Sequence, residues 1–96
     1  MIVSDLLSFA RTLEGQEIRA RRQRKPFLVE VDGDRLMYRC PTGDSASLRQ
    51  ESQIALAETL ELFRNTQSLT PAHYQHFSRN AAYTLALIEL YLSRVQ

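Results

Sequence analysis

The sequence predicts an α+β domain in which a small antiparallel β-hairpin sheet packs with about four helices. Residues 27–40 show a period of two on both sides of an Asp-Gly-Asp turn, which is typical of paired, half-buried strands. The alternate positions that form the predicted buried face are Phe27, Val29, Val31, Leu36, Tyr38 and Cys40. The flanking segments instead repeat apolar residues every three to four positions, which indicates amphipathic helices. The predicted element order is α-β-β-β-α-α-α.

The length of 96 residues predicts one domain, residues 1–96. No apolar run is long enough to cross a bilayer, and the first ten residues lack the basic flank of a secretory signal. The single cysteine, Cys40, excludes an intrachain disulfide. We therefore expect a cytoplasmic protein without a membrane partner.

The first helix is expected over about residues 3–14, because its apolar residues have helical spacing and Gly15 can end it. Residues 17–21 then alternate around Ile18, which favours a short strand. A helix that continues past Gly15 is the alternative. Pro26 has no N–H group, so it suits the start of an edge strand that follows a basic loop.

The hairpin can pair in two registers that bury the same apolar face, because they differ by two residues. A turn at residues 32–33 would place Val29 opposite Leu36. A turn at residues 33–34 would place Val31 opposite Leu36. Both turns use the freedom of glycine to adopt positive φ, and we favour the second because it buries Val31.

After a turn at residues 41–44, residues 45–48 are compatible with a short extra strand. Ser47 and Gln50 also match a capping box, which predicts a helix that runs to about Phe63. This helix would bury Ile54, Leu56, Ala57, Leu60 and Phe63, and it would expose Glu51, Glu58 and Glu61.

Two further helices are expected towards the C-terminus. Thr70 and Pro71 predict the start of a short helix that ends near Phe77. Ser78 can cap a last helix that runs to about Arg94. That helix is apolar almost all round, which is typical of a buried element. Either the other helices cover it, or it meets a second copy of the chain through Tyr83, Leu87, Leu90 and Tyr91.

Basic residues are concentrated in one part of the chain. The net charge is only +1, but residues 19–49 hold eight Arg or Lys and four acids. Dense basic clusters suit a nucleic-acid backbone, because each neutralised phosphate releases counterions and arginine can bind phosphate through two hydrogen bonds. A solvated basic loop is the simpler alternative. The expected contacts to DNA or RNA come from Arg19, Arg21, Arg22, Arg24, Lys25, Arg35 and Arg39.

No residue pattern indicates an enzyme, a cofactor, a metal site or a small-molecule substrate. His73 and His76 lie three residues apart, but no further ligand stands at a suitable spacing. The acids at the hairpin tip most simply form its turn, and Cys40 has no histidine near it in the sequence. We expect a non-enzymatic nucleic-acid-binding or regulatory module, with a homodimeric protein-interaction module as the alternative.

The order of these features resembles small prokaryotic winged-helix-like modules that accompany restriction, defence or mobile-element proteins. The resemblance spans residues 15–90 and implies an interaction with DNA or with a DNA-processing partner. In that family the last helix would be a recognition helix, but here only Arg79 and Asn80 are placed to read a groove. The residues that carry the resemblance are Gly15, Ile18, Lys25-Pro26-Phe27, Thr42-Gly43, Leu69-Thr70, Arg79-Asn80-Ala81-Ala82-Tyr83 and Ala86-Leu87.

Overall fold

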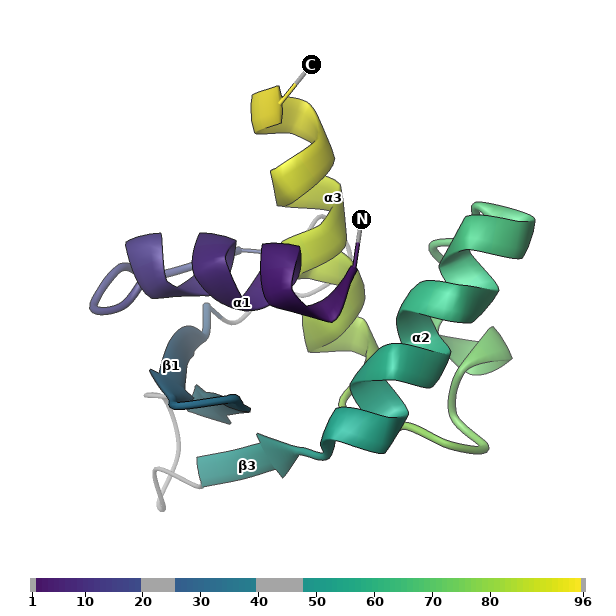
Figure 1. Cartoon of the computed structure of the whole chain (residues 1–96), viewed down its shortest axis with the longest axis horizontal. Coiled ribbons are helices and arrows are strands. Elements are labelled where there is room, and N and C mark those ends of the chain that lie inside the picture. The colour runs from purple at the N-terminus through teal and green to yellow at the C-terminus, as the bar shows by residue number, and fades with distance from the viewer. Residues whose placement is uncertain (1, 20–25, 40–47, 96) are drawn as a thin grey trace.

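A computed structural model describes residues 2–19, 26–39 and 48–95 of the chain (Figure 1). Its described elements are one three-stranded antiparallel sheet, three α-helices and one 3-10 turn, so the predicted α+β class is confirmed. Helix α1 lies across one side of the sheet, α3 passes behind α1, and α2 lies to the side of both (Figure 1). The elements are α1 (Val3–Thr12), β1 (Leu28–Asp32), β2 (Arg35–Arg39), β3 (Leu48–Glu51), α2 (Gln53–Thr66), η1 (Pro71–His73) and α3 (Ala81–Val95).

The hairpin adopts the register that buries Val31. Strands β1 and β2 pair through the two-residue turn Gly33-Asp34, and Val31 lies opposite Leu36. Gly33 has a φ of 63°, a conformation that glycine reaches without a clash of its own Cβ atom. The prediction of the hairpin and of its preferred register is therefore confirmed.

The third strand is not the one that alternation around Ile18 predicted. Among the described residues, Ile18 forms only an isolated bridge with Phe27, and β3 (Leu48–Glu51) takes the place beside β2. Only Leu48 belongs to the stretch that was compatible with an extra strand. Over residues 17–19 the predicted strand is thus corrected to a single bridge, and residues 20–21 of that prediction lie outside the described residues.

Helix α2 starts later than the capping box at Ser47 predicted. Ser52 is its N-cap, and the Ser52 hydroxyl accepts a hydrogen bond from the Ala55 N–H at 3.0 Å. Residues 48–51 are extended instead, because their backbone groups pair with β2. The predicted capping position, Ser47, lies outside the described residues.

The buried face of α2 is also rotated from the predicted one. Ile54 is 74 % exposed and Ala57 is exposed, whereas Glu51, which was expected outside, is only 4 % exposed. Glu51 belongs to β3 and faces the core because it lies opposite the buried Leu36. The side chains that α2 buries are Ala55, Leu56, Thr59, Leu60 and Phe63.

The short helix predicted after Thr70 is a 3-10 turn, so the described residues hold three α-helices rather than about four. The Tyr74 side chain is buried, and its hydroxyl donates to the Ser68 carbonyl oxygen at 2.7 Å. This bond joins the residue after the 3-10 turn to the segment before it. Ser78 does not cap the last helix, because its hydroxyl donates to Glu51 instead. Helix α3 begins at Ala81.

The core lies between the sheet and the helices. Phe27, Val29, Leu36 and Tyr38 cover the inner face of the sheet and are at most 1 % exposed. Burying a side chain of this size stabilises a fold by about 1.5–3 kcal/mol. No helix in the described part of the chain is long and apolar enough to span a membrane. The helices contribute Leu6, Ala10, Leu13, Leu56, Leu60, Leu85, Leu87 and Ile88 to this core.

Candidate functional site

The bridge between Ile18 and Phe27 brings the two ends of the basic segment together. Its two N–H to oxygen distances are 2.8 and 2.9 Å, and both side chains are buried. The residues between them, 19–26, include five Arg or Lys. Arg19 is exposed, whereas Arg21, Arg22, Arg24 and Lys25 lie outside the described residues. The bridge therefore anchors this segment to the fold at both of its ends.

Arg39 lies at the same end of the sheet as this bridge, because it is opposite Leu28, the residue after Phe27. The Arg39 Nε atom is 3.2 Å from the Glu30 Oε1 atom, and both side chains are more than a third exposed. An exposed pair of this kind contributes about 0–1 kcal/mol, so a phosphate can compete for the guanidinium at little cost.

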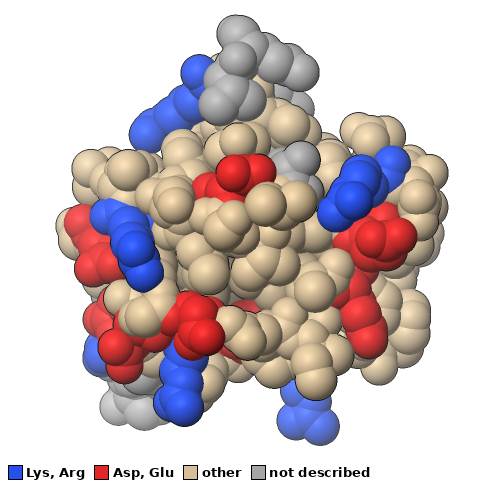
Figure 2. Space-filling model, viewed as in Figure 1, with Lys and Arg blue, Asp and Glu red and all other residues tan. Residues whose placement is uncertain are grey.

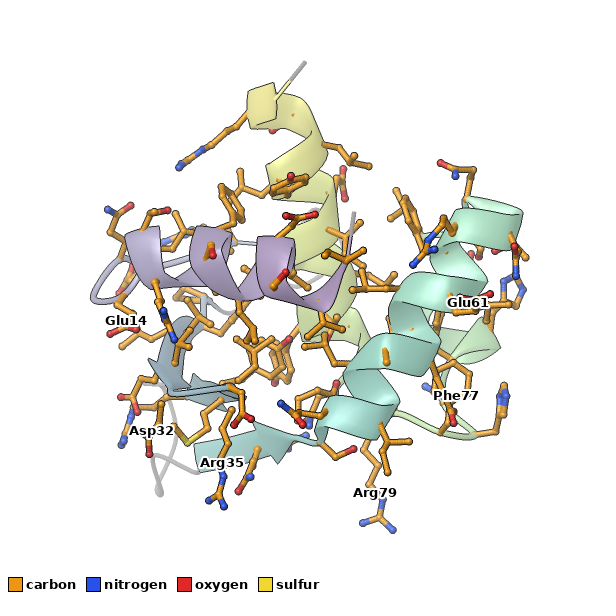
Figure 3. The ribbon with its side chains drawn as sticks, in the orientation of Figure 1. Glu14, Asp32, Arg35, Glu61, Phe77 and Arg79 are labelled. Carbon is orange, nitrogen blue, oxygen red and sulfur yellow. The ribbon has the colours of Figure 1, made fainter. Side chains whose placement is uncertain are left out.

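Arg35 lies at the opposite end of β2, beside the turn. Its cross-strand partner is Asp32. Arg35 and Arg39 are four positions apart along the strand, which corresponds to about 13 Å. The side chains of Arg35 and Arg79 extend away from the fold on the same side of the molecule (Figure 3). The structure therefore places Arg39 near the Ile18–Phe27 bridge that flanks the basic segment, and Arg35 at the other end of the sheet.

The face of the molecule that Figure 2 shows carries no single basic patch of described residues. Basic and acidic side chains are interspersed on the face that Figure 2 shows. The outer face of the sheet has a mixed character as well, since Glu30, Met37 and Arg39 are all partly exposed on it. In the sequence, the densest run of basic residues is the segment between Ile18 and Phe27.

A buried polar cluster joins the sheet to α3. The hydroxyls of Ser78 and Thr84 donate to the Glu51 Oε2 atom at 2.8 and 3.1 Å. The Tyr38 hydroxyl lies 2.6 Å from the Thr84 Oγ1 atom. Because the Thr84 proton points to Glu51, Tyr38 is the donor in that second contact.

Burial raises the pKa of the Glu51 carboxyl, although the hydrogen bonds from Ser78 and Thr84 oppose this effect. Burial also raises the pKa of the Tyr38 hydroxyl, which keeps it protonated. Tyr38 and Glu51 are thus the titratable groups of the cluster. Among the described residues, the cluster contains no nucleophile paired with a general base, as covalent catalysis would require. The sequence pattern does not reveal this cluster, because helical spacing places Glu51 on an exposed helix face. Ser52 was the available signal, since serine is a preferred N-cap and stands just before the apolar run of α2.

An open pocket of about 400 Å³ lies beside this cluster, between the hairpin turn and the start of α2. Its lining combines an exposed isoleucine with charged side chains of both signs, so its chemistry favours neither anions nor cations. The lining residues are Asp34, Arg35, Gln50, Glu51, Ser52, Gln53 and Ile54.

The α3 residues proposed for an interface differ in their exposure. Leu87 is 0 % exposed within the chain, so it offers no surface to a second copy. Tyr83 packs against Phe27 with ring centroids 4.9 Å apart, and Tyr91 packs against Phe9 at 5.3 Å. Tyr83, Leu90 and Tyr91 keep partly exposed surface, and their role in a homodimer stays a prediction.

The histidines lie on the surface. The Ser68 hydroxyl is 2.6 Å from the His73 Nδ1 atom, and the His76 ring packs on Phe77. Over residues 2–19, 26–39 and 48–95, no three His, Cys, Asp or Glu side chains come together as a metal would require. Cys40 is outside this part of the chain.

No similar protein was found. Comparisons of the chain with protein-family models, curated proteins and solved structures all gave no match. The resemblance to winged-helix-like modules stays a prediction. Asn80, which that resemblance places at the start of a recognition helix, is only 7 % exposed, and its side-chain amide donates to the Gln50 carbonyl oxygen. Of these two residues, Arg79 alone is exposed.

Proposed function

We propose that this chain is a small non-enzymatic module that binds nucleic acid through phosphate contacts from residues 19–25 and Arg39. The bridge between Ile18 and Phe27 carries this proposal, because it anchors both ends of a segment that holds five basic residues. Anchored ends reduce the conformational entropy that the segment loses when it binds a ligand.

The position of Arg39 supports the same surface. It lies next to the anchored segment, and its only described ion pair, with Glu30, is solvent-exposed. Arg35 lies about 13 Å away along β2, a length over which one strand of a duplex presents about four phosphates. Arg35 therefore extends the proposed contact as a separate point rather than as part of one dense patch.

The test is fluorescence anisotropy of labelled duplex DNA and duplex RNA at two salt concentrations. Binding should weaken steeply with salt and should be similar across sequences, because phosphate contacts carry no sequence information. The variant R22E/R24E should bind at least about tenfold more weakly and should lower the salt slope by about 2. The variant R64E/R94E changes the net charge equally at exposed sites on α2 and α3, and it should bind far better than R22E/R24E.

Two results would overturn the proposal: no binding of either duplex at low salt, or equal losses in the two double variants. Equal losses would mean that binding follows net charge alone and needs no anchored segment. No binding at all would favour the alternative of a homodimeric protein-interaction module.

A further inference from the structure

A small cavity lies between the C-terminal halves of α2 and α3, where the two helices diverge (Figure 1). Its volume is about 160 Å³. The residues that α2 and its C-cap contribute follow helical spacing, so they share the side of α2 that is turned towards the cavity. The lining residues are Leu60, Phe63, Arg64, Gln67 and Leu92.

The inner part of this cavity is apolar. Leu60 and Phe63 are only 2 % and 7 % exposed, and Leu92 of α3 is partly exposed beside them. A group that displaces water from these three side chains gains most if it is itself apolar. Apolar protein cavities of about 150 Å³ accommodate one benzene ring. The cavity therefore has the size and the lining for a single aromatic ring.

The outer part of the cavity is polar and carries one charge. Arg64 and Gln67 are both exposed, and no acidic side chain of the described residues lines the cavity. Within this part of the chain, Arg64 also makes no ion pair. Its planar guanidinium can bind a carboxylate through two parallel hydrogen bonds. The charge at the cavity thus favours an anionic group next to the ring.

The C-terminal end of a helix repels anions through its free carbonyl groups, and Gln67 reduces this effect here. The Gln67 N–H donates to the Phe63 carbonyl oxygen at 2.7 Å, and its side-chain amide donates to the Arg64 carbonyl oxygen at 3.4 Å. Two carbonyl groups at this end of α2 are therefore already paired. An anion beside Arg64 meets less repulsion than it would at an uncapped helix end.

We propose that this cavity binds a small aromatic carboxylate, whose ring lies against the three apolar side chains and whose carboxylate pairs with Arg64. A phosphate ester fits less well, because its greater charge costs more to dehydrate beside apolar side chains. None of the lining residues is among those proposed to contact nucleic acid, so this inference does not rest on the proposed function.

The test is a titration of the full isotope-labelled chain with benzoate, followed by nitrogen-15 NMR. Benzoate should shift the amides of residues 60–67 and those near Leu92, and these shifts should saturate. Benzyl alcohol keeps the ring without the charge, so it should bind about fivefold more weakly, as expected for the loss of one exposed ion pair. Acetate keeps the charge without the ring and should give no saturable shift at these amides.

One pair of variants separates the cation at the cavity from net charge. Arg64→Gln should weaken benzoate binding by about fivefold and should leave benzyl alcohol binding unchanged. Arg94→Gln is the matched control, because Arg94 is also exposed but does not line the cavity, and it should bind benzoate like the wild type.

Three results would overturn the proposal. They are the absence of saturable shifts up to about 10 mM benzoate, shifts confined to other parts of the chain, and equal affinities for benzoate and benzyl alcohol. Equal losses in the two arginine variants would also overturn it, because binding would then follow net charge. If Arg64→Gln does not fold, the three probes on the wild-type chain decide alone.

Discussion

Tyr38 shows how a single polar atom is accommodated in this small core. Its side chain is 0 % exposed and its ring lies 5.8 Å from Phe27 and 5.3 Å from Tyr83, centroid to centroid. The hydroxyl nevertheless has a partner, Thr84, at 2.6 Å. Every buried side-chain nitrogen and oxygen in the described residues has a hydrogen-bond partner. No polar side chain of the described core therefore has the full desolvation penalty of an unpaired group.

The Tyr38 hydroxyl can be tested directly. Tyr38→Phe keeps the ring but removes the donor to Thr84, so it should lower the free energy of unfolding by about 1 kcal/mol. Tyr91→Phe is the matched control, because Tyr91 is partly exposed and should change stability by less than about 0.5 kcal/mol. Urea denaturation at neutral pH measures both. Equal effects of the two substitutions would show that the buried hydrogen bond contributes nothing.

At the scale of elements, the junction of β3 and α2 is decided by one capping residue. Ser52 adopts an extended conformation with ψ of 151°, and the helix begins at the next residue. The strand before it and the helix after it thus share no residue. The αL conformation of Gln67, with φ of 56°, closes the other end of the same helix.

Two serines distinguish the observed start of α2 from the one that the capping box predicted. Ser52→Ala should lower the free energy of unfolding by about 1 kcal/mol, because the Ala55 N–H loses its acceptor. Ser47→Ala should change it by less than about 0.5 kcal/mol, since Ser47 caps no helix that starts at Gln53. Thermal unfolding measures both variants. If the helix began at the predicted capping box, Ser47→Ala would lower the free energy of unfolding more than Ser52→Ala does.

At the scale of the whole molecule, the charge balance depends on the segment that the proposed function uses. The described residues carry ten acids and eight arginines. The complete chain reaches +1 because Arg21, Arg22, Arg24 and Lys25 are added, against Asp44 alone. Variants in this segment are therefore expected to weaken nucleic-acid binding more than variants elsewhere that change the net charge by the same amount.

The oligomeric state also belongs to this scale. Leu87→Ala should cost about 2–5 kcal/mol of stability at any protein concentration, because Leu87 lies in the core of its own chain. A side chain at a dimer interface would instead give a loss that depends on concentration. Leu90→Ala is the comparison, since Leu90 is partly exposed on the same helix. Denaturation at two protein concentrations separates a core role from an interface role for each residue.

The sequence alone determined those parts of the fold that depend on neighbouring residues. Helix α1, the hairpin and its Gly33-Asp34 turn follow from apolar periodicity and from the freedom of glycine, both of which act over a few positions. The basic segment was likewise visible in the sequence. Its anchoring between Ile18 and Phe27 was not, because alternation predicted a longer strand there.

Only the tertiary structure decided the third strand, the later start of α2 and the burial of Glu51. Residues 48–51 fit a first helical turn as well as a strand, and pairing with β2 selects the strand. That pairing turns Glu51 inward, where Ser78 and Thr84 meet it from far along the chain. Glutamate by itself favours a helix over a strand, so the pairing of β3 with β2, which no local pattern specifies, overrides that preference and decides where Glu51 lies.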